Sequence, residues 1–320
     1  MRRMLAALAA ALVAGSAFAQ QYPSKPLRVI VPWPPGQATD LAARLVAQKV
    51  SELIGQPIVA DNRPGAGGII GTEAVAKAAP DGYMLLAGSS GPLSINPLLQ
   101  KTPYDPEKSF APISLIATVP YVLVTAPNFP ASSARELIAL VRANPGKYTF
   151  ASSGTGATTH LITEVFNFRA NLQAVHVPYK GSGPSLTDVM GGQVAYTIET
   201  MAAVVSNVRA GRLKALAISS AQRNAALPDV PTVAEAADMP GFDMNAWIGY
   251  LAPAGTPGEI VNRLSGEVQK ALASPDVRER YATLGLNPTS TTPEELAKLM
   301  RDESVRYADI IKRANIKLEQ

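Results

Sequence analysis

The stretch "VIVPWPPGQATD", residues 29–40, contains the pattern that decides the fold. A β-branched run stops at three prolines, and Thr39 and Asp40 then stand at the start of an amphipathic segment. Proline cannot donate a hydrogen bond to a sheet, and the residue before it is held in an extended conformation. The stretch therefore predicts a strand, a stiff loop and a helix, in that order. A stiff loop at such a place is well suited to ligand binding.

The same alternation of strands and helices continues along the chain and predicts two α/β units. In the first unit we expect strands at 27–33, 57–61 and 84–88, a helix at 40–54 and another helix that ends at residue 79. After a strand at 121–125, the second unit is expected to hold helices at 132–143, 159–168, 184–190 and 201–210, with strands at 148–152, 174–179, 194–199 and 213–219. A strand at 246–252 and helices at 259–273 and 293–314 are expected to end the chain.

Each unit is predicted to be a mainly parallel sheet flanked by helices. Two chain crossings are expected, near 125–127 and 220–228. Lobe 1 would then comprise residues 20–125 and 228–320, and lobe 2 residues 126–227. Two lobes joined by two crossing segments form a hinge with a ligand cleft between them.

The first 19 residues have the composition of a secretory signal peptide. Arg2 and Arg3 precede a short apolar stretch, and Ala17-Phe18-Ala19 is an A-x-A cleavage site. No other stretch has the ~18 uninterrupted apolar residues of a membrane span, so the mature chain is not expected to be embedded in a membrane. The chain has no cysteine, which fits an exported protein of this size that rests on its core, and the bacterial periplasm is the expected compartment.

The charge of the chain excludes a nucleic-acid partner. The net charge is +4 at pH 7, and no run of basic residues is present. We expect no metal site, because two histidines without cysteines do not make one. We also expect a monomer that binds no cofactor.

Three loops at the expected carboxyl ends of strands share small and hydroxylated residues, where open parallel sheets bind ligands. They are residues 34–39, 89–90 and 152–159. Small residues let a ligand approach the backbone, and a helix N-terminus adds N–H donors and partial positive charge. One such loop from each lobe predicts an anion site made without Arg or Lys. The alternative is that Thr39 and Thr158 or Thr159 only cap their helices.

Evidence for catalysis is weak in this sequence. The serines lack a G-x-S-x-G elbow. His160, in the first turn of its helix, is expected to be a neutral donor or acceptor, and it is the candidate base if the chain were a serine hydrolase. Glu199 ends a strand and would repel an acid unless it meets an amino or hydroxyl group; the alternative is a solvated edge residue. Trp33 and Trp247 are expected to be walls or core.

Six stretches together resemble the Bug-type solute receptors of tripartite tricarboxylate transporters, along nearly the whole mature chain. They are "YPSKPLRVIVPWPPGQATD", "VADNRPGAGGIIGTEAVAKAAPDGY", "FASSGTGATTHL", "VPYKGSGPSLTDVMGGQV", "ALPDVPTVAEA" and "WIGYLAPAGTP". The resemblance implies a two-lobed periplasmic binding protein fold that closes on a small carboxylate and passes it to membrane permease subunits. It also implies that backbone groups and water hold the carboxylate, with Glu199 and Thr200 where the family often has Asp-Asn. Gln37 and Trp33 depart from the usual glycine and phenylalanine.

The sequence thus predicts a receptor without enzymatic activity, whose ligand is a small organic acid, with a dicarboxylate as the first expectation and an aromatic acid as a variant. The alternatives are the input domain of a membrane-bound sensor and a secreted serine hydrolase. The expected ligand-binding residues are Pro35, Gly36, Gln37, Ala38, Thr39, Ser89, Ser90, Ser153, Gly154, Thr155, Gly156, Ala157, Thr158, Thr159, His160, Tyr179, Glu199 and Thr200.

Overall fold

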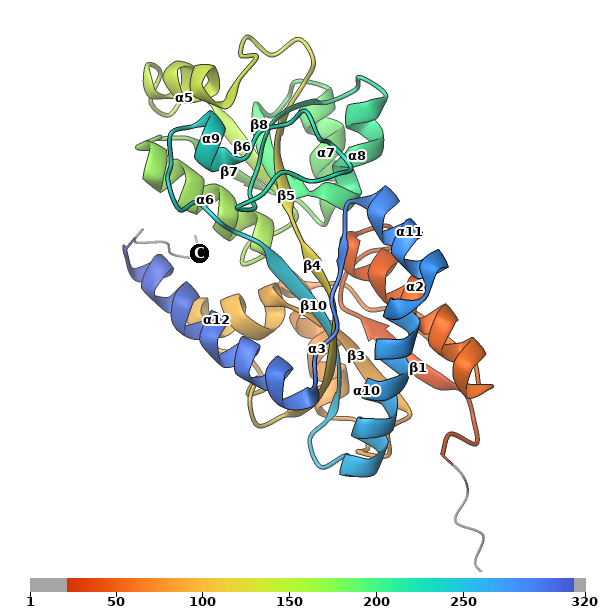
Figure 1. Cartoon of the computed structure of the whole chain (residues 1–320). Coiled ribbons are helices and arrows are strands. Elements are labelled where there is room, and N and C mark those ends of the chain that lie inside the picture. The colour runs from red at the N-terminus through yellow and green to blue at the C-terminus, as the bar shows by residue number, and fades with distance from the viewer. Residues whose placement is uncertain (1–21, 314–320) are drawn as a thin grey trace, which may run out of the picture.

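A computed structural model describes residues 22–313, which form two α/β lobes joined by two crossing segments (Figure 1). The first lobe is built on a six-stranded sheet of order β11-β4-β10-β3-β1-β2, and the second on a five-stranded sheet of order β7-β6-β8-β5-β9. The predicted two-lobed fold is confirmed. The predicted signal peptide lies outside the described residues.

The first sheet consists of β1 (Leu27–Val31), β2 (Ile58–Asn62), β3 (Met84–Ser89), β4 (Phe110–Val119), β10 (Ala246–Pro253) and β11 (Asn287–Pro288). Its helices are α2 (Ala38–Ile54), α3 (Ile69–Ala76), α4 (Asn96–Leu99), α10 (Gly258–Ala273), α11 (Pro275–Leu284) and α12 (Pro293–Arg313), with helical turns η1 (Ala66–Gly68) and η2 (Gly91–Ile95). Helix α2 packs its apolar face on this sheet and ends at Gly55, whose φ of 69° is the left-handed conformation that glycine adopts without strain.

The second sheet consists of β5 (Tyr121–Thr125), β6 (Thr149–Ser152), β7 (Val175–Pro178), β8 (Tyr196–Thr200) and β9 (Lys214–Ile218). Its helices are α5 (Ala134–Arg142), α6 (Thr158–Ala170), α7 (Ser182–Met190), α8 (Met201–Arg209) and α9 (Val233–Ala236). Both sheets are mixed rather than mainly parallel, because β5, β4 and β10 run antiparallel to their neighbours.

The first crossing lies at Pro120, between β4 and β5, and not at 125–127 as predicted. Strand β4 was missed, because Pro112 and Pro120 interrupt an apolar run that continues into β5. β5 pairs only with strands of the second sheet, so residues 121–125 lie in the second lobe.

The second crossing lies just before Ala246, later than the predicted 220–228. The chain after β9 stays on the second lobe, because Thr232 forms a bridge with Ile218 and α9 packs near β9. The chain then returns to the first sheet as β10. Helix α11, which was also not predicted, packs against both α2 of the first lobe and α8 of the second.

The two lobes meet in the structure on either side of the crossing strands. The backbone of Gly156 lies against Asn96, and that of Gly181 lies against Gln37. The molecule is therefore closed around the space between the lobes. Within residues 22–313, no helix has the length and apolarity needed to cross a bilayer.

Candidate ligand-binding site

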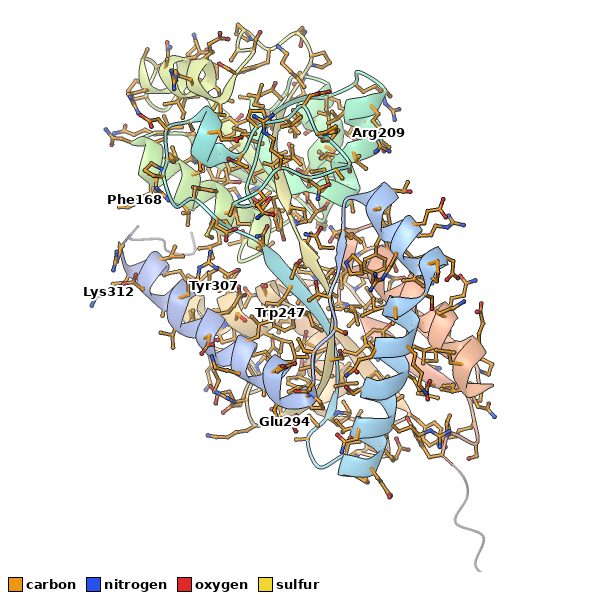
Figure 2. The ribbon with its side chains drawn as sticks, viewed as in Figure 1. Phe168, Arg209, Trp247, Glu294, Tyr307 and Lys312 are labelled. Atoms are coloured by element: carbon orange, nitrogen blue, oxygen red, sulfur yellow. The ribbon has the colours of Figure 1, made fainter. Side chains whose placement is uncertain are left out.

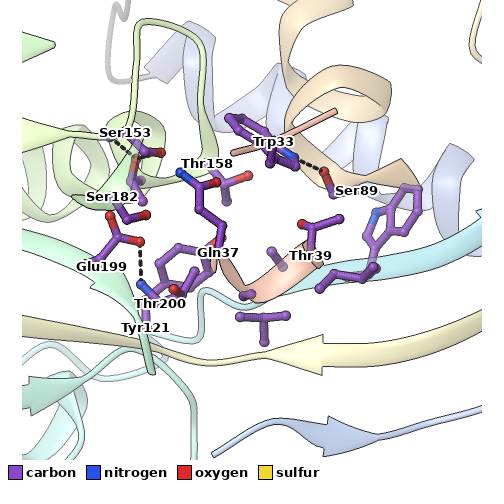
Figure 3. A pocket seen from close by; sticks show the side chains of 16 residues that line it. Trp33, Gln37, Thr39, Ser89, Tyr121, Ser153, Thr158, Ser182, Glu199 and Thr200 are labelled. Atoms are coloured by element: carbon purple, nitrogen blue, oxygen red, sulfur yellow. Dashed lines mark hydrogen bonds between the residues drawn. The ribbon is translucent and has the colours of Figure 1, made fainter. Parts of the chain in front are cut away.

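A cavity of about 30 Å³ lies between the lobes, against the crossing strands (Figure 3). Both lobes and both crossings contribute to its wall. The lining residues are Trp33, Gln37, Ala38, Thr39, Ser89, Val119, Tyr121, Ser153, Thr158, Thr159, Ser182, Glu199, Thr200, Ala246, Trp247 and Ile248. In this closed molecule the cavity has room for water-sized groups only, and its wall sets a few polar groups among apolar side chains, as ligand pockets do.

Four helices begin at this cavity, and none of them is capped by a side chain. The residues before the first turns of α2, α6, α7 and α8 are Gln37, Ala157, Gly181 and Thr200, and no N-cap side chain hydrogen-bonds to the helix. The capping role considered for Thr39, Thr158 and Thr159 is therefore wrong. The first-turn N–H groups have no partner inside a helix and carry partial positive charge. That of Met201 in α8 donates to the Pro120 carbonyl at 2.9 Å, and the others are left for a ligand.

Two helices of the second lobe that begin away from the cavity, α5 and α9, are capped by side chains. Ser133 accepts a hydrogen bond from the backbone N–H of Glu136 at the start of α5. Thr232 and Glu235 form a reciprocal capping box at the start of α9. Helices α10 and α11, which also begin away from the cavity, have no side-chain cap either, so the cavity helices are distinguished by their convergence on one site and not by the missing caps alone.

The first cleft loop, residues 34–39, is held inside its own lobe by Asp40. The Asp40 carboxylate accepts hydrogen bonds from the backbone N–H of Gly36 at 2.9 Å, from Arg44 at 2.8 Å and from Asn62 at 2.8 Å. The N–H of Gly36 is thereby used within the loop. It is not available to a ligand, contrary to our expectation for this residue.

The second cleft loop, residues 152–159, is also closed on itself. Thr159 Oγ1 accepts from the backbone N–H of Ser153 at 2.9 Å, and Ser152 Oγ accepts from that of Gly154 at 3.2 Å. The N–H of Gly156 points to His160 Nδ1 at 3.4 Å. The donors that remain for an anion thus belong to the first turns of the helices and not to the loops.

Nine of the eighteen predicted residues line the cavity: Gln37, Ala38, Thr39, Ser89, Ser153, Thr158, Thr159, Glu199 and Thr200. Pro35 and Gly36 lie in an outer groove at one cleft mouth, and Gly154, Thr155 and Tyr179 lie in a groove at the other. Gly156 and Ala157 belong to the second loop but do not line the cavity, His160 lies beneath that loop, and Ser90 lies behind Trp247.

Seven lining residues were not predicted as ligand contacts: Trp33, Val119, Tyr121, Ser182, Ala246, Trp247 and Ile248. Five of them lie on the strands that enter or leave the crossings, so a correct placement of the crossings would have indicated them. Ser182 follows a strand and a glycine and begins a helix, which is the same pattern as in the predicted loops. Trp33 was assigned to a wall, and its indole N–H donates to Ser89 Oγ at 3.1 Å in that wall.

Two buried glutamates lie near the crossings. Burial raises the pKa of Glu199, in the cavity wall, to about 7, although the backbone N–H of Thr200, which donates to Oε1, and the nearby hydroxyl groups of Ser182 and Thr200 act against the shift. Burial likewise raises the pKa of Glu303, on α12, to about 7. Ser90 donates to Glu303 at 3.1 Å and accepts from the backbone N–H of Trp247 at 3.0 Å. Figure 2 labels Trp247 on β10 and Tyr307 on α12, the strand and the helix that meet at Ser90 and Glu303.

The two histidines are stacked on one another beneath the second cleft loop, with ring centroids 4.0 Å apart. Burial lowers the pKa of His160 to about 3 and that of His176 to about 4, so both are neutral at pH 7. His176 Nε2 lies 2.7 Å from Ser152 Oγ. This pair does not support the hydrolase alternative, because Ser152 is fully buried and does not line the cavity. Within the described residues, no group of three or more His, Cys, Asp or Glu side chains is placed to hold a metal ion.

Comparison with known proteins gives consistent results over the whole chain. Residues 42–316 match the tripartite tricarboxylate transporter family receptor. The chain is similar to protein BugT of Bordetella pertussis, with 41% identity over 325 residues that cover 100% of this chain and 99% of BugT. It is similar in structure to R. palustris Rpa4515 with adipate, at 34% identity and a TM-score of 0.89 over 92% of this chain and 99% of the other. It is also similar to MatC (Rpa3494) from Rhodopseudomonas palustris with bound malate, at 34% identity and a TM-score of 0.86 over 91% and 100%.

Proposed function

Because the chain belongs to the tripartite tricarboxylate transporter receptor family, we propose that it is an extracytoplasmic receptor that captures a small dicarboxylate and delivers it to the permease of such a transporter. The observation that carries the proposal is the convergence of four uncapped helix starts on one cavity between the two lobes. Backbone N–H groups at helix starts bind anions without a cationic side chain.

The ligand class is supported by the shape and chemistry of the cavity. Within residues 22–313, no Lys or Arg side chain lines it, while Gln37, Thr158 and Ser182 offer polar groups from both lobes. Two solved relatives bind adipate and malate, which are both dicarboxylates. A carboxylate held at one end from the first lobe and at the other end from the second would draw the lobes together.

A thermal-shift screen with adipate, malate and matched monocarboxylates tests the ligand class. A ligand that binds only the folded state raises the midpoint of unfolding by mass action. We expect at least one dicarboxylate to raise it more than the monocarboxylate of equal chain length. If no acid raises it, the proposed function is wrong.

The compartment and the permease are tested separately. The protein isolated from the periplasm should begin at or near Gln20, and intact Met1 on that product would contradict export through the predicted signal peptide. Deleting the gene should abolish uptake of the dicarboxylate found in the screen. Uptake that continues unchanged, with the acid still bound by the receptor, would favour a sensing role instead.

A further inference from the structure

The cavity wall contains one carboxyl group whose second oxygen has no partner. Glu199 lies at the end of β8 and is fully buried. Its Oε1 accepts a hydrogen bond from the backbone N–H of Thr200 at 2.8 Å, as Figure 3 shows. Among the described residues, Oε2 has no hydrogen-bond partner. A cavity suited to an anion therefore contains an acid with a free oxygen.

No cation balances Glu199 inside the cavity. The groups that face it are Thr200 on β8, Ser182 at the start of α7 and Tyr121 on β5. Ser182 and Thr200 are neutral, and burial raises the pKa of Tyr121 so that its phenol keeps its proton. The lining residues include no Lys, Arg, His or Asp. The raised pKa of Glu199 agrees with this surrounding.

Glu199 and a ligand carboxylate placed directly beside it cannot both keep a full negative charge without a cation, and the pair instead shares a proton. The helix starts offer partial positive charge to the carboxylates of the ligand, while a charged Glu199 beside one of them would gain no partner. Resting on the proposed function, we infer that Glu199 is a neutral acid in the complex and donates a hydrogen bond from Oε2 to the bound carboxylate, so that capture of the ligand takes up one proton from solvent.

Glu199 then selects the group that the ligand presents to it. A neutral carboxylic acid donates to a carboxylate, whereas a charged one would bind an ammonium group. A dicarboxylate without an amine at that end fits the neutral form. The same ligand with an amine in that position would drive Glu199 to lose its proton.

Calorimetry with adipate and malate, in pairs of buffers that differ in ionisation enthalpy, counts the protons taken up. At pH 8, where free Glu199 is mostly charged, we expect uptake close to one proton per ligand. At pH 6 we expect only a small fraction of that uptake. The association constant should fall ~10-fold per pH unit above pH 7, because one proton is linked to binding.

Two variants make the test specific. Glu199→Gln retains a neutral hydrogen-bond donor, so it should bind at pH 8 at least as well as the parent and show no linked proton. Glu303→Gln is the matched control: it removes a second buried carboxyl that lies outside the cavity lining, and it should leave the proton uptake unchanged. Both variants should melt cooperatively, which confirms that they fold.

Each outcome has one meaning. If the acids bind the parent without proton uptake at pH 8, or if Glu199→Gln loses more than tenfold in affinity at every pH, Glu199 is charged in the complex and the inference is wrong while the proposed function stands. If neither these two acids nor any other acid of the screen binds, the proposed function and the inference both fail.

Discussion

The two cleft loops have similar composition but different surroundings. In the first loop, Gly36 faces open space, and a Cβ added there would meet no atom within 4 Å. In the second loop, a Cβ added at Gly156 would lie 2.1 Å from Asn96 Oδ1 on the other lobe. The first loop is tied to its own lobe through Gly36 and Asp40 and meets the other lobe through its Pro34 and Gln37 side chains, whereas Gly156 of the second loop packs its backbone directly against Asn96 of the opposite lobe.

This difference means that the loops contribute to binding in different ways. The first loop is a fixed wall that presents the start of α2. The contact of the second loop with Asn96 exists only while the lobes are closed. Changes in the second loop should therefore alter closure and affinity, and changes in the first loop should alter stability.

The largest effect is expected for Gly156→Ala. The added methyl group would displace Asn96, which is fully buried and donates to the Gly67 carbonyl at 2.9 Å. We expect more than tenfold loss of dicarboxylate affinity, about 1.4 kcal/mol or more, measured by calorimetry. Small-angle scattering should show that the radius of gyration no longer falls on ligand addition.

Gly146→Ala is the control for this variant. Gly146 has a φ of 72°, close to the 76° of Gly156, but open space around its Cβ position. It should lose some stability and keep both affinity and closure. Adding Asn96→Ala to Gly156→Ala should restore closure in part; an unchanged double variant would mean that backbone strain and not the contact is responsible.

Acidification should damage the second loop more than the first, because both His160 and His176 lie beneath the second loop. The pKa values of His160 and His176 are lowered in the folded state, so their neutral forms stabilise the protein fully above pH 6.5. This stability is lost as the pH falls from 6.5 toward 4. We expect a fall of several degrees in the melting midpoint over that range, and a shallower fall in His176→Gln. Equal slopes in the parent and the variant would show that the stacked pair does not titrate as described.

Gly36→Ala should have a moderate effect that is confined to stability. Its φ of 83° is unfavourable for any residue with a Cβ, at a cost of about 1–2 kcal/mol. Urea unfolding should show this loss, while calorimetry should find affinity within about threefold of the parent. A loss of affinity as large as that of Gly156→Ala would remove the distinction between the loops.

The smallest effect is expected for Lys180→Ala. Lys180 is exposed and does not line the cavity, although it stands beside both outer grooves. We expect affinity within twofold of the parent at physiological salt. A loss comparable to that of a charge-assisted hydrogen bond, ~1.5–3 kcal/mol, would mean that a side-chain cation holds the ligand.

Much of the fold could be predicted from local sequence patterns. The proline-rich break before α2, the glycine-rich break before α6 and the periodicity of the helices depend on neighbours in the chain, so their signals are local. Strand β4 escaped because its apolar run is interrupted by prolines and merges with β5. That one omission moved the first crossing by five residues and concealed the cavity residues on the crossing strands.

The sequence alone determined the family of the chain, its two lobes and the loops that precede the helices of the site. Only the tertiary structure decided which backbone N–H groups remain free, because Asp40 and Thr159 use those of the loops. It also decided that Glu199 is buried with no cation beside it, whereas its position at the end of a strand is equally consistent with a solvated residue. Burial and the absence of a nearby cation are properties of residues far apart in the chain, and they meet only when the two lobes come together.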